Sequence, residues 1–202
     1  MAYHYINHEK FNLKPGDILA FSGKGPLSAW INLVTRGIPA YDASHCSILA
    51  DWEGRLLNWE STAIHQRLGE NRCEITGECI RGVQAHTLQH ALHRRGKIWV
   101  YRLKRELTKE QSAELTAFLR SQIGKPYGFV GAGKTFGGIC RAWIRQWLFK
   151  QNLDTVWCSE YVGAAANVFW PGLVRNPSAW APNALLRLLV RDGVYGSRER
   201  LK

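Results

Sequence analysis

The sequence lacks an apolar segment of the ~20 residues needed to span a bilayer, because Arg, Lys or Gly interrupts even its most apolar stretches. Its first residues, MAYHYINHEKF, lack the apolar core of a signal peptide. We therefore expect a cytoplasmic protein, unless another system delivers it outside. Repeats and linkers are also missing, and 46% apolar and 21% charged residues over 202 positions exclude a disordered, collagen-like or coiled-coil chain. Residues 1–202 are expected to form one domain.

Cysteines are few and odd in number, which argues against a framework of disulfides. The five are Cys46, Cys73, Cys79, Cys140 and Cys158. Their wide spacing predicts free thiols in a reducing compartment.

Acidic residues are scarce in the second half of the chain. Residues 1–90 carry 8 basic and 9 acidic side chains, whereas residues 91–202 carry 19 and 7, so the net charge of +11 arises entirely after residue 90. No nucleic-acid-binding motif accompanies this charge, which makes nucleic acid an unlikely partner. An anionic substrate or a lipid surface suits it better.

The pattern of apolar residues predicts strands first and helices afterwards. Strands are expected within 13–23, 44–63, 82–88 and 97–103, and helices within 107–123, 141–150, 155–169 and 181–193. Thr108 is expected to cap the first helix, with Gln111 in the capping-box position. This order predicts an α+β fold in which a strand-rich half (1–105) forms an antiparallel, barrel-like sheet, and the helices of 106–202 pack against it.

The segment 44–63 has two apolar runs separated by DWEG, which is typical of a β-hairpin. A four-residue loop would place His45 directly opposite Glu60, with Cβ atoms about 5 Å apart. A two-residue turn at Glu53 and Gly54 would leave them diagonal on one face, and a three-residue loop would put them on opposite faces. On a shared face, the carboxylate can fix the tautomer of the imidazole and raise its pKa.

Cys158 is the candidate nucleophile, because an imidazole oriented by a carboxylate activates a thiol at its other nitrogen. Asp154 or Thr155 is expected to cap a helix whose first turn contains Cys158, where free N–H groups and the helix dipole favour a thiolate. The structural alternative is that Cys158 is a small core residue and His45 a half-buried polar group.

The segments SHCSI, NWEST and WCSEYV occur in this order, with KPGDILAFSG, GV at 82–83 and GKPYGF. Together they resemble the circularly permuted papain-like enzymes related to NlpC-type cell-wall peptidases, specifically the YiiX/YaeF type of amidase. The resemblance extends over about residues 14–190. It implies a permuted papain-like fold in which the cysteine helix follows the histidine strand, as it also does in relatives of lecithin:retinol acyltransferase.

The resemblance also implies a role for each matching residue. Cys158 would be the nucleophile, His45 the general base and acid, and Glu60 the residue that orients His45. Tyr127 matches an aromatic position that helps to bind the oxyanion in relatives.

The function expected from these residues is a thiol hydrolase without a cofactor. It would cleave a peptide, peptidoglycan-type or acyl-amide bond through an acyl-enzyme. A lipid acyltransferase or thioesterase of the same fold is a close alternative. A non-catalytic module that binds lipid or cell wall is an alternative from a different class.

The segment 128–135, GFVGAGKT, fits the phosphate-loop pattern G-x-x-x-x-G-K-[ST]. Its defining residues are Gly128, Gly133, Lys134 and Thr135. A phosphate loop needs a buried strand before it and a helix after it. Here a GKPY turn precedes the segment and the glycine-rich TFGGI follows it, so a nucleotide-binding enzyme remains an alternative to a glycine-rich loop near the active site.

Five residues of the first half have side chains that can bind zinc: Cys73, Cys79, His86, His90 and His93. The first four have the spacing C-x5-C-x6-H-x3-H, which is wider than a C-x2-4-C knuckle. We therefore expect scattered core and surface residues rather than a metal site.

The segment 141–150, RAWIRQWLFK, places Trp143 and Trp147 among basic residues. An interfacial helix has this composition, with aromatic rings in lipid and basic groups at phosphates, and it would bring the protein into peripheral contact with a membrane. The same residues also fit the core face of an ordinary helix.

Overall fold

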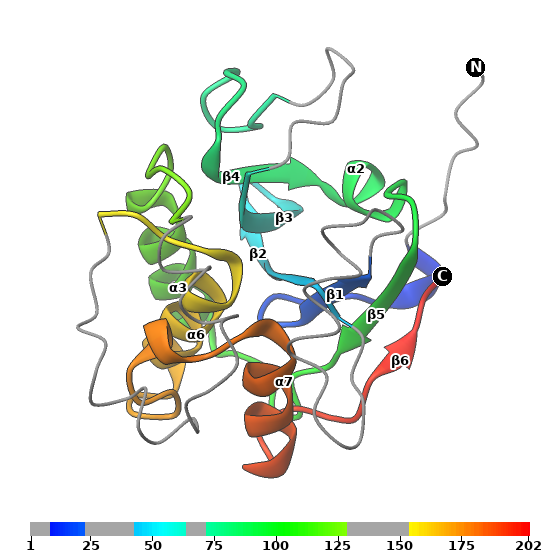
Figure 1. The fold of residues 1–202 in the computed structure, drawn as a ribbon. Helices are drawn as coiled ribbons and strands as arrows, with labels where there is room; N and C mark the ends of the chain where they lie inside the picture. Colours follow the sequence, from blue (N-terminus) through cyan, green and yellow to red (C-terminus); the bar gives the residue numbers. More distant parts are fainter. Residues whose placement is uncertain (1–8, 23–42, 64–71, 129–153) are drawn as a thin grey trace.

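The computed structural model describes residues 9–22, 43–63, 72–128 and 154–202 (Figure 1). Its centre is a six-stranded antiparallel sheet with the strand order β4-β3-β2-β1-β5-β6. The strands are β1 (Ile18–Ser22), β2 (His45–Trp52), β3 (Arg55–Thr62), β4 (Gly82–Thr87), β5 (Lys97–Tyr101) and β6 (Glu199–Arg200). The helices are α2 (Leu88–Leu92), α3 (Lys109–Ser121), α6 (Cys158–Phe169) and α7 (Pro182–Arg191), with 3-10 turns η1 (Glu9–Phe11) and η2 (Pro177–Ala179).

The predicted α+β class is confirmed, and the predicted strand segments contain β1 to β5. The capping box of Thr108 and Gln111 starts α3 as predicted. The sequence patterns did not reveal α2, or β6 at the end of the helical half. The helix expected over 141–150 lies outside the described residues.

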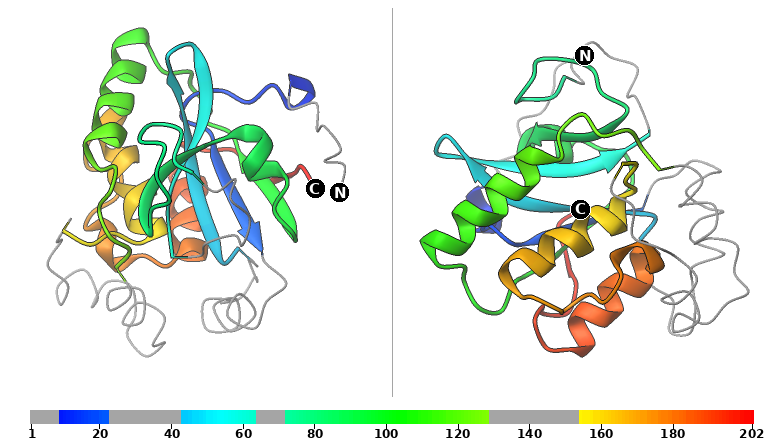
Figure 2. Two further views of the ribbon diagram at one scale, coloured as in Figure 1. Left: turned by 90° about the horizontal axis from the view of Figure 1, so that it is seen from above. Right: turned by 90° about the vertical axis from the view of Figure 1, so that its left-hand side faces the viewer.

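The sheet has a helical layer on each face (Figures 1 and 2). Alternating residues of β1 show the division, because Ile18 belongs to the core formed with α3, α6 and α7, whereas Leu19 packs with α2. Both faces are therefore buried. The helices α3, α6 and α7 form the larger layer.

The expectation of a barrel-like sheet is wrong, because the sheet is open with β4 and β6 at its edges. The outer edge of β4 is occupied by another part of the chain: the N–H of Val83 donates to the carbonyl of Lys125. Gly82 allows this approach, since a Cβ atom there would lie 1.9 Å from the Lys125 oxygen. An edge that is already hydrogen-bonded cannot pair with a second edge strand.

The β2–β3 hairpin has the two-residue turn that the sequence left as one of three possibilities. Ile48 pairs with Trp59, and the same register continues to the turn. Glu53 and Gly54 have φ values of 51° and 75°, the left-handed conformation that this tight hairpin turn requires. The four-residue and three-residue loops are therefore wrong.

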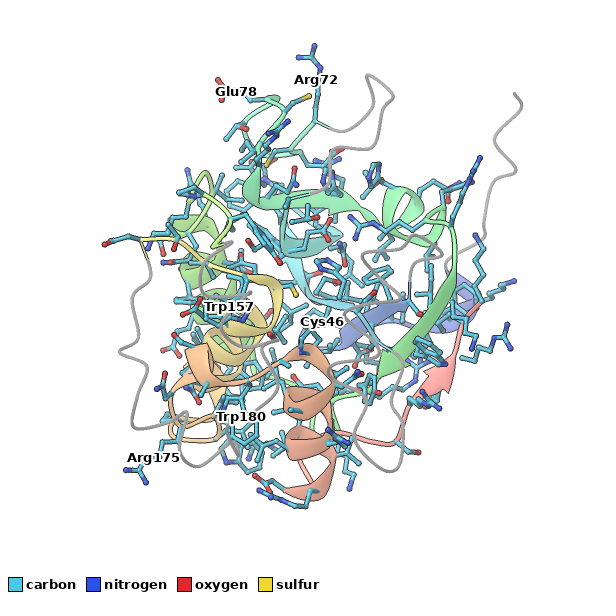
Figure 3. All side chains as sticks on the ribbon, viewed as in Figure 1. Cys46, Arg72, Glu78, Trp157, Arg175 and Trp180 are labelled. Atoms are coloured by element: carbon cyan, nitrogen blue, oxygen red, sulfur yellow. The ribbon has the colours of Figure 1, made fainter. Side chains whose placement is uncertain are left out.

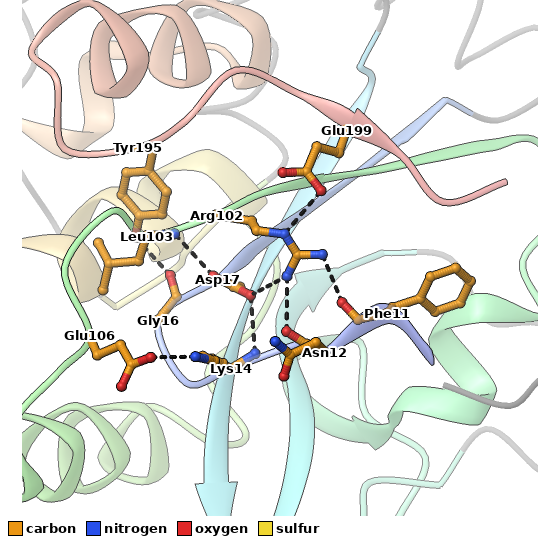
Figure 4. Close-up of polar contacts among 10 residues, drawn as sticks. All are labelled: Phe11, Asn12, Lys14, Gly16, Asp17, Arg102, Leu103, Glu106, Tyr195 and Glu199. Atoms are coloured by element: carbon orange, nitrogen blue, oxygen red, sulfur yellow. Dashed lines mark hydrogen bonds and ion pairs between the residues drawn. The ribbon is translucent and has the colours of Figure 1, made fainter. Parts of the chain in front are cut away.

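A polar cluster around Arg102 ties the first strand to the end of the chain (Figure 4). Arg102 Nε donates to Glu199 at 3.0 Å, and its Nη1 lies 3.6 Å from Asp17. The buried Asp17 carboxylate also accepts the N–H of Leu103 at 3.0 Å. This cluster fixes β1, which lies beside β2 in the sheet.

No helix among the residues that the model describes has the length and apolar character needed to cross a membrane.

Candidate active site

His45 and Glu60 lie where the paired part of the hairpin ends. The β2–β3 register extends from the turn to Ile48 and Trp59, and beyond it the strands contact each other through side chains. His45 Nε2 lies 2.5 Å from Glu60 Oε2, so the imidazole donates to the carboxylate. The Glu60 side chain is fully buried and that of His45 is 17% exposed. The diagonal placement on one face is thus the arrangement that the two-residue turn predicts.

Cys158 is the first residue of α6, immediately after the cap residue Trp157. The prediction that Asp154 or Thr155 caps this helix is wrong. The chain before Trp157 is held in an extended conformation, because the N–H of Val156 donates to the carbonyl of Pro126. The helix therefore starts later than predicted, and no side chain occupies its N-terminal hydrogen-bonding groups.

Three side chains hydrogen-bond to the sulfur of Cys158. They are His45 and Cys46 from the start of β2 and Tyr127 from the loop beside β4. Figure 3 labels Cys46 on β2 and Trp157 at the start of α6, the two elements that meet at this point. Since Glu60 occupies Nε2 of His45, the nitrogen that faces the sulfur is Nδ1. One imidazole thus connects the carboxylate to the thiol.

The electrostatics favour a thiolate at Cys158. A hydrogen bond from the Cys46 thiol and the nearby His45 imidazole both lower the pKa of Cys158, whereas burial raises it. Together they hold the pKa of Cys158 well below its usual range. The start of α6 adds free backbone N–H groups. Burial and the neighbouring Cys158 raise the pKa of Cys46, so Cys46 remains the thiol that donates.

The imidazole carries the opposite charge. Burial by itself would lower the pKa of His45, but the charges of and hydrogen bonds to Cys158 and Glu60 raise it to about 9. The directions of both shifts therefore favour a thiolate–imidazolium pair of Cys158 and His45 near neutral pH. Tyr127 stays protonated, because burial and Cys158 raise the pKa of its hydroxyl.

Glu60 keeps its negative charge although it is buried. Burial raises its pKa, yet Arg94 and His45 together hold the pKa well below the usual range of a carboxyl. Arg94 donates from Nη1 to Glu60 Oε2 at 2.7 Å and from Nη2 to Oε1.

A family model described as "permuted papain-like amidase enzyme, YaeF/YiiX, C92 family" matches residues 12–135. The chain belongs to this family. The match includes His45, Glu60 and Tyr127, and it ends before Cys158. Membership therefore rests on the strand-rich half and the loop that follows α3.

The fold of the amidase family is seen in the crystal structure of the metalloprotein YiiX from Escherichia coli O157:H7. That structure is similar with a TM-score of 0.54 and 20% sequence identity, over 80% of this chain and 68% of the other. No curated protein sequence matches the chain.

Two residues of this family member were missed by reasoning from the sequence. Cys46 had a signal, because it directly follows His45, but only the packing of α6 on β2 brings its thiol to Cys158. Arg94 had none. It follows α2 and is 34 positions from Glu60 in the sequence.

The zinc and phosphate-loop alternatives gain no support from the structure. Within residues 9–22, 43–63, 72–128 and 154–202, no group of three or more His, Cys, Asp or Glu side chains could hold a metal ion. His86 and His90 instead stack with their ring centroids 4.3 Å apart. Gly133, Lys134 and Thr135 lie outside the described residues, and every strand pairing in the described sheet is antiparallel.

Proposed function

We propose that this amidase-family member is a thiol hydrolase that cleaves an amide bond through an acyl-enzyme on Cys158. The observation that carries the proposal is one imidazole, His45, hydrogen-bonded both to the buried Glu60 carboxylate and to a thiol at the start of a helix. A nucleophile, a base and an orienting group in this arrangement are the parts that nucleophilic acyl transfer needs.

In the first step, the Cys158 thiolate attacks the carbonyl carbon and forms the C–S bond of a tetrahedral intermediate. The negative charge moves to the carbonyl oxygen, where the backbone N–H of Cys158 and the hydroxyl of Tyr127 donate to it. His45 then gives its Nδ1 proton to the amide nitrogen as the C–N bond breaks. The amine leaves and a thioester remains on Cys158.

In the second step, neutral His45 takes a proton from water, and the resulting hydroxide attacks the thioester carbonyl. Collapse of this second intermediate breaks the C–S bond and releases the acid. The thiolate and the imidazolium are restored. If an alcohol or amine replaces water, the same steps give acyl transfer.

The amide bond that is cleaved belongs to one of three classes: a peptide, a peptidoglycan-type amide or an acyl-amide. A panel containing peptidoglycan fragments, acyl-amino acids and phospholipids distinguishes these classes, and adding hydroxylamine as an acceptor detects acyl transfer. Although the similar YiiX structure is described as a metalloprotein, every proposed step uses groups of this chain.

Alkylation by iodoacetamide at pH 5.5 tests the nucleophile, because an ordinary thiol with a pKa of about 8.5 is almost fully protonated there. We expect Cys158 to be modified selectively, and His45→Ala to suppress the modification. Mass spectrometry of peptides locates the label. Cys79 is exposed, which makes it the internal control for an accessible thiol outside the site. Equal, slow labelling of all five cysteines would contradict the proposal.

A further inference from the structure

The Glu60 carboxylate has a second strong partner besides His45. Arg94 contacts both of its oxygens, with Nη1 2.7 Å from Oε2, the same atom that accepts from His45. Glu60 is fully buried and the Arg94 side chain is 14% exposed. A two-pronged contact of this kind fixes the plane of a carboxylate as well as its charge.

Two further ionisable side chains of the described residues, His86 and His90, lie near Glu60. His86 on β4 lies 3.8 Å from Glu60 Oε1, and His90 on α2 stacks behind His86. Burial lowers the pKa of His86, and burial together with His86 and Arg94 lowers the pKa of His90 to about 4. Both rings therefore favour the neutral form at pH 7, and among the described residues Arg94 and His45 are the cations that lower the pKa of Glu60 most strongly.

Arg94 is itself held in place by the fold. Its guanidinium lies 4.9 Å from the ring of Phe21 on β1, and that ring lies 5.6 Å from the imidazole of His45. The N–H of Arg94 donates to the carbonyl of Ala91 at the end of α2, and its carbonyl accepts from Nζ of Lys202. The guanidinium is thus fixed relative to both Glu60 and His45.

We propose that Arg94 is a positioning residue, which keeps the Glu60 carboxylate ionised and aimed at His45 and so maintains the Cys158 thiolate. The inference rests on the proposed function, in which Cys158 attacks the substrate. Arg94 touches neither the substrate nor Cys158 in this role.

The physical reason lies in the cost of burying a carboxylate. A buried carboxyl without a fixed cation takes up a proton rather than remain charged. A protonated Glu60 would lose most of its attraction for imidazolium, and His45 would then release its proton more easily. With a neutral imidazole, the thiolate of Cys158 would lose its counter-charge and become a thiol.

The test is the rate of iodoacetamide labelling at Cys158 as a function of pH, in the full chain. Arg94→Gln is expected to move the acid limb of this profile, which reports the titration of Cys158, to higher pH. Without the opposite charge the pKa of the Glu60 carboxyl should rise by about one to three units, and Glu60 then stabilises the imidazolium less. Arg94→Lys keeps the charge and should recover part of the shift. An unchanged acid limb in both variants overturns the proposal.

Arg102→Gln is the matched control, because Arg102 also forms ion pairs with carboxylates, the buried Asp17 and the exposed Glu199, but lies away from Glu60. It should lower the melting temperature without moving the acid limb. If it shifts the limb as much as Arg94→Gln does, loss of stability explains the effect and the proposal is wrong. In a Glu60→Gln background, Arg94→Gln should add no further shift, and an additional shift of the same size also overturns the proposal.

A measurement without Cys158 separates this inference from the proposed function. In Cys158→Ala, the carboxyl carbon of Glu60 can be titrated by NMR with and without Arg94→Gln. We expect Glu60 to be ionised at pH 6 when Arg94 is present and to take up its proton at a higher pH when it is absent. Equal pKa values overturn the role of Arg94, whereas absent labelling of Cys158 in the unaltered protein rejects only the proposed function.

Discussion

At the scale of single residues, the charges of the candidate site depend on neighbours that oppose burial. Cys158 is buried and His45 is partly buried, and burial alone disfavours the thiolate and the imidazolium. Each ion supplies the charge that stabilises the other, and Glu60 and Cys46 provide a further hydrogen bond at each end. Changing any of these four side chains should therefore alter the titration of the others.

The first prediction concerns the pH range of the imidazolium. With its pKa raised to about 9, His45 should be charged at neutral pH and lose its proton as the pH rises through 9. Turnover of an amide should fall over that range, because the leaving nitrogen loses its proton donor, while alkylation of the thiolate continues. NMR titration of the ring checks the value, and Cys158→Ala should move it to lower pH because burial then dominates.

The second prediction concerns Cys46→Ala, which removes the thiol that donates to Cys158. A hydrogen bond to a charged group contributes about 1.5–3 kcal/mol, equivalent to about one to two pH units in the pKa of Cys158. The acid limb of the pH profile of Cys158 alkylation should move to higher pH by this amount, as measured by labelling rates between pH 4 and pH 8. Cys73→Ala is the control, since Cys73 is another buried free thiol and donates no hydrogen bond to Cys158. An unchanged limb in Cys46→Ala rejects the role assigned to this thiol.

At the scale of elements, the site forms where the hairpin meets the start of α6. Ser61 on β3 donates its hydroxyl to the carbonyl of Val156 at 2.5 Å, and Val156 is also bridged to Tyr127. These contacts attach the chain just before Cys158 to the sheet that carries His45. The distance between Cys158 and His45 is therefore set by contacts outside these two side chains.

The third prediction follows from this attachment. Ser61→Ala should lower the rate of Cys158 alkylation at pH 6 severalfold, because α6 is then held less firmly against the sheet. The loss of stability should be about 1 kcal/mol, the usual value of one hydrogen bond. Tyr195→Phe is a matched control, since it removes a buried hydrogen bond from the Tyr195 hydroxyl to the carbonyl of Gly16, just before β1 (Figure 4). Equal effects of the two variants on alkylation would show that Ser61 has no specific role.

At the scale of the whole molecule, the two halves of the chain contribute different parts of the site. Residues 1–90, which are nearly neutral, carry His45 and Glu60, and the basic residues 91–202 carry Cys158. We propose that the positive charge of the second half attracts an anionic substrate or a lipid surface.

The fourth prediction tests a peripheral contact with membranes. Replacing Arg141, Arg145 and Lys150 by Ser should weaken binding to vesicles that contain phosphatidylserine by about 1 kcal/mol for each charge that lies at the surface. Sedimentation with vesicles at 0.1 M salt measures this, and vesicles of phosphatidylcholine alone are the control. If binding and turnover both remain unchanged, these charges serve only to keep the surface solvated.

Local features could be predicted from the sequence because neighbouring residues decide them. The apolar periods located β1 to β5, and the Thr108 and Gln111 side chains determined the start of α3. The hairpin segment predicted that His45 and Glu60 share a face if the turn has two residues. The length of the turn could not be predicted. The two-residue turn requires Glu53 to adopt a positive φ, a conformation that is more common for glycine or asparagine.

The sequence by itself determined the α+β class, the family resemblance, and the order in which the histidine strand precedes the cysteine helix. Only the tertiary structure decided that the sheet is open, that α6 begins at Cys158, and that Arg94 and Cys46 reach the site. These features depend on contacts between distant segments, such as the occupied edge of β4 and the bonds that hold Val156 extended. The pKa shifts of the site also depend on the tertiary structure, because side chains are buried and charged groups approach one another only once the layers have packed.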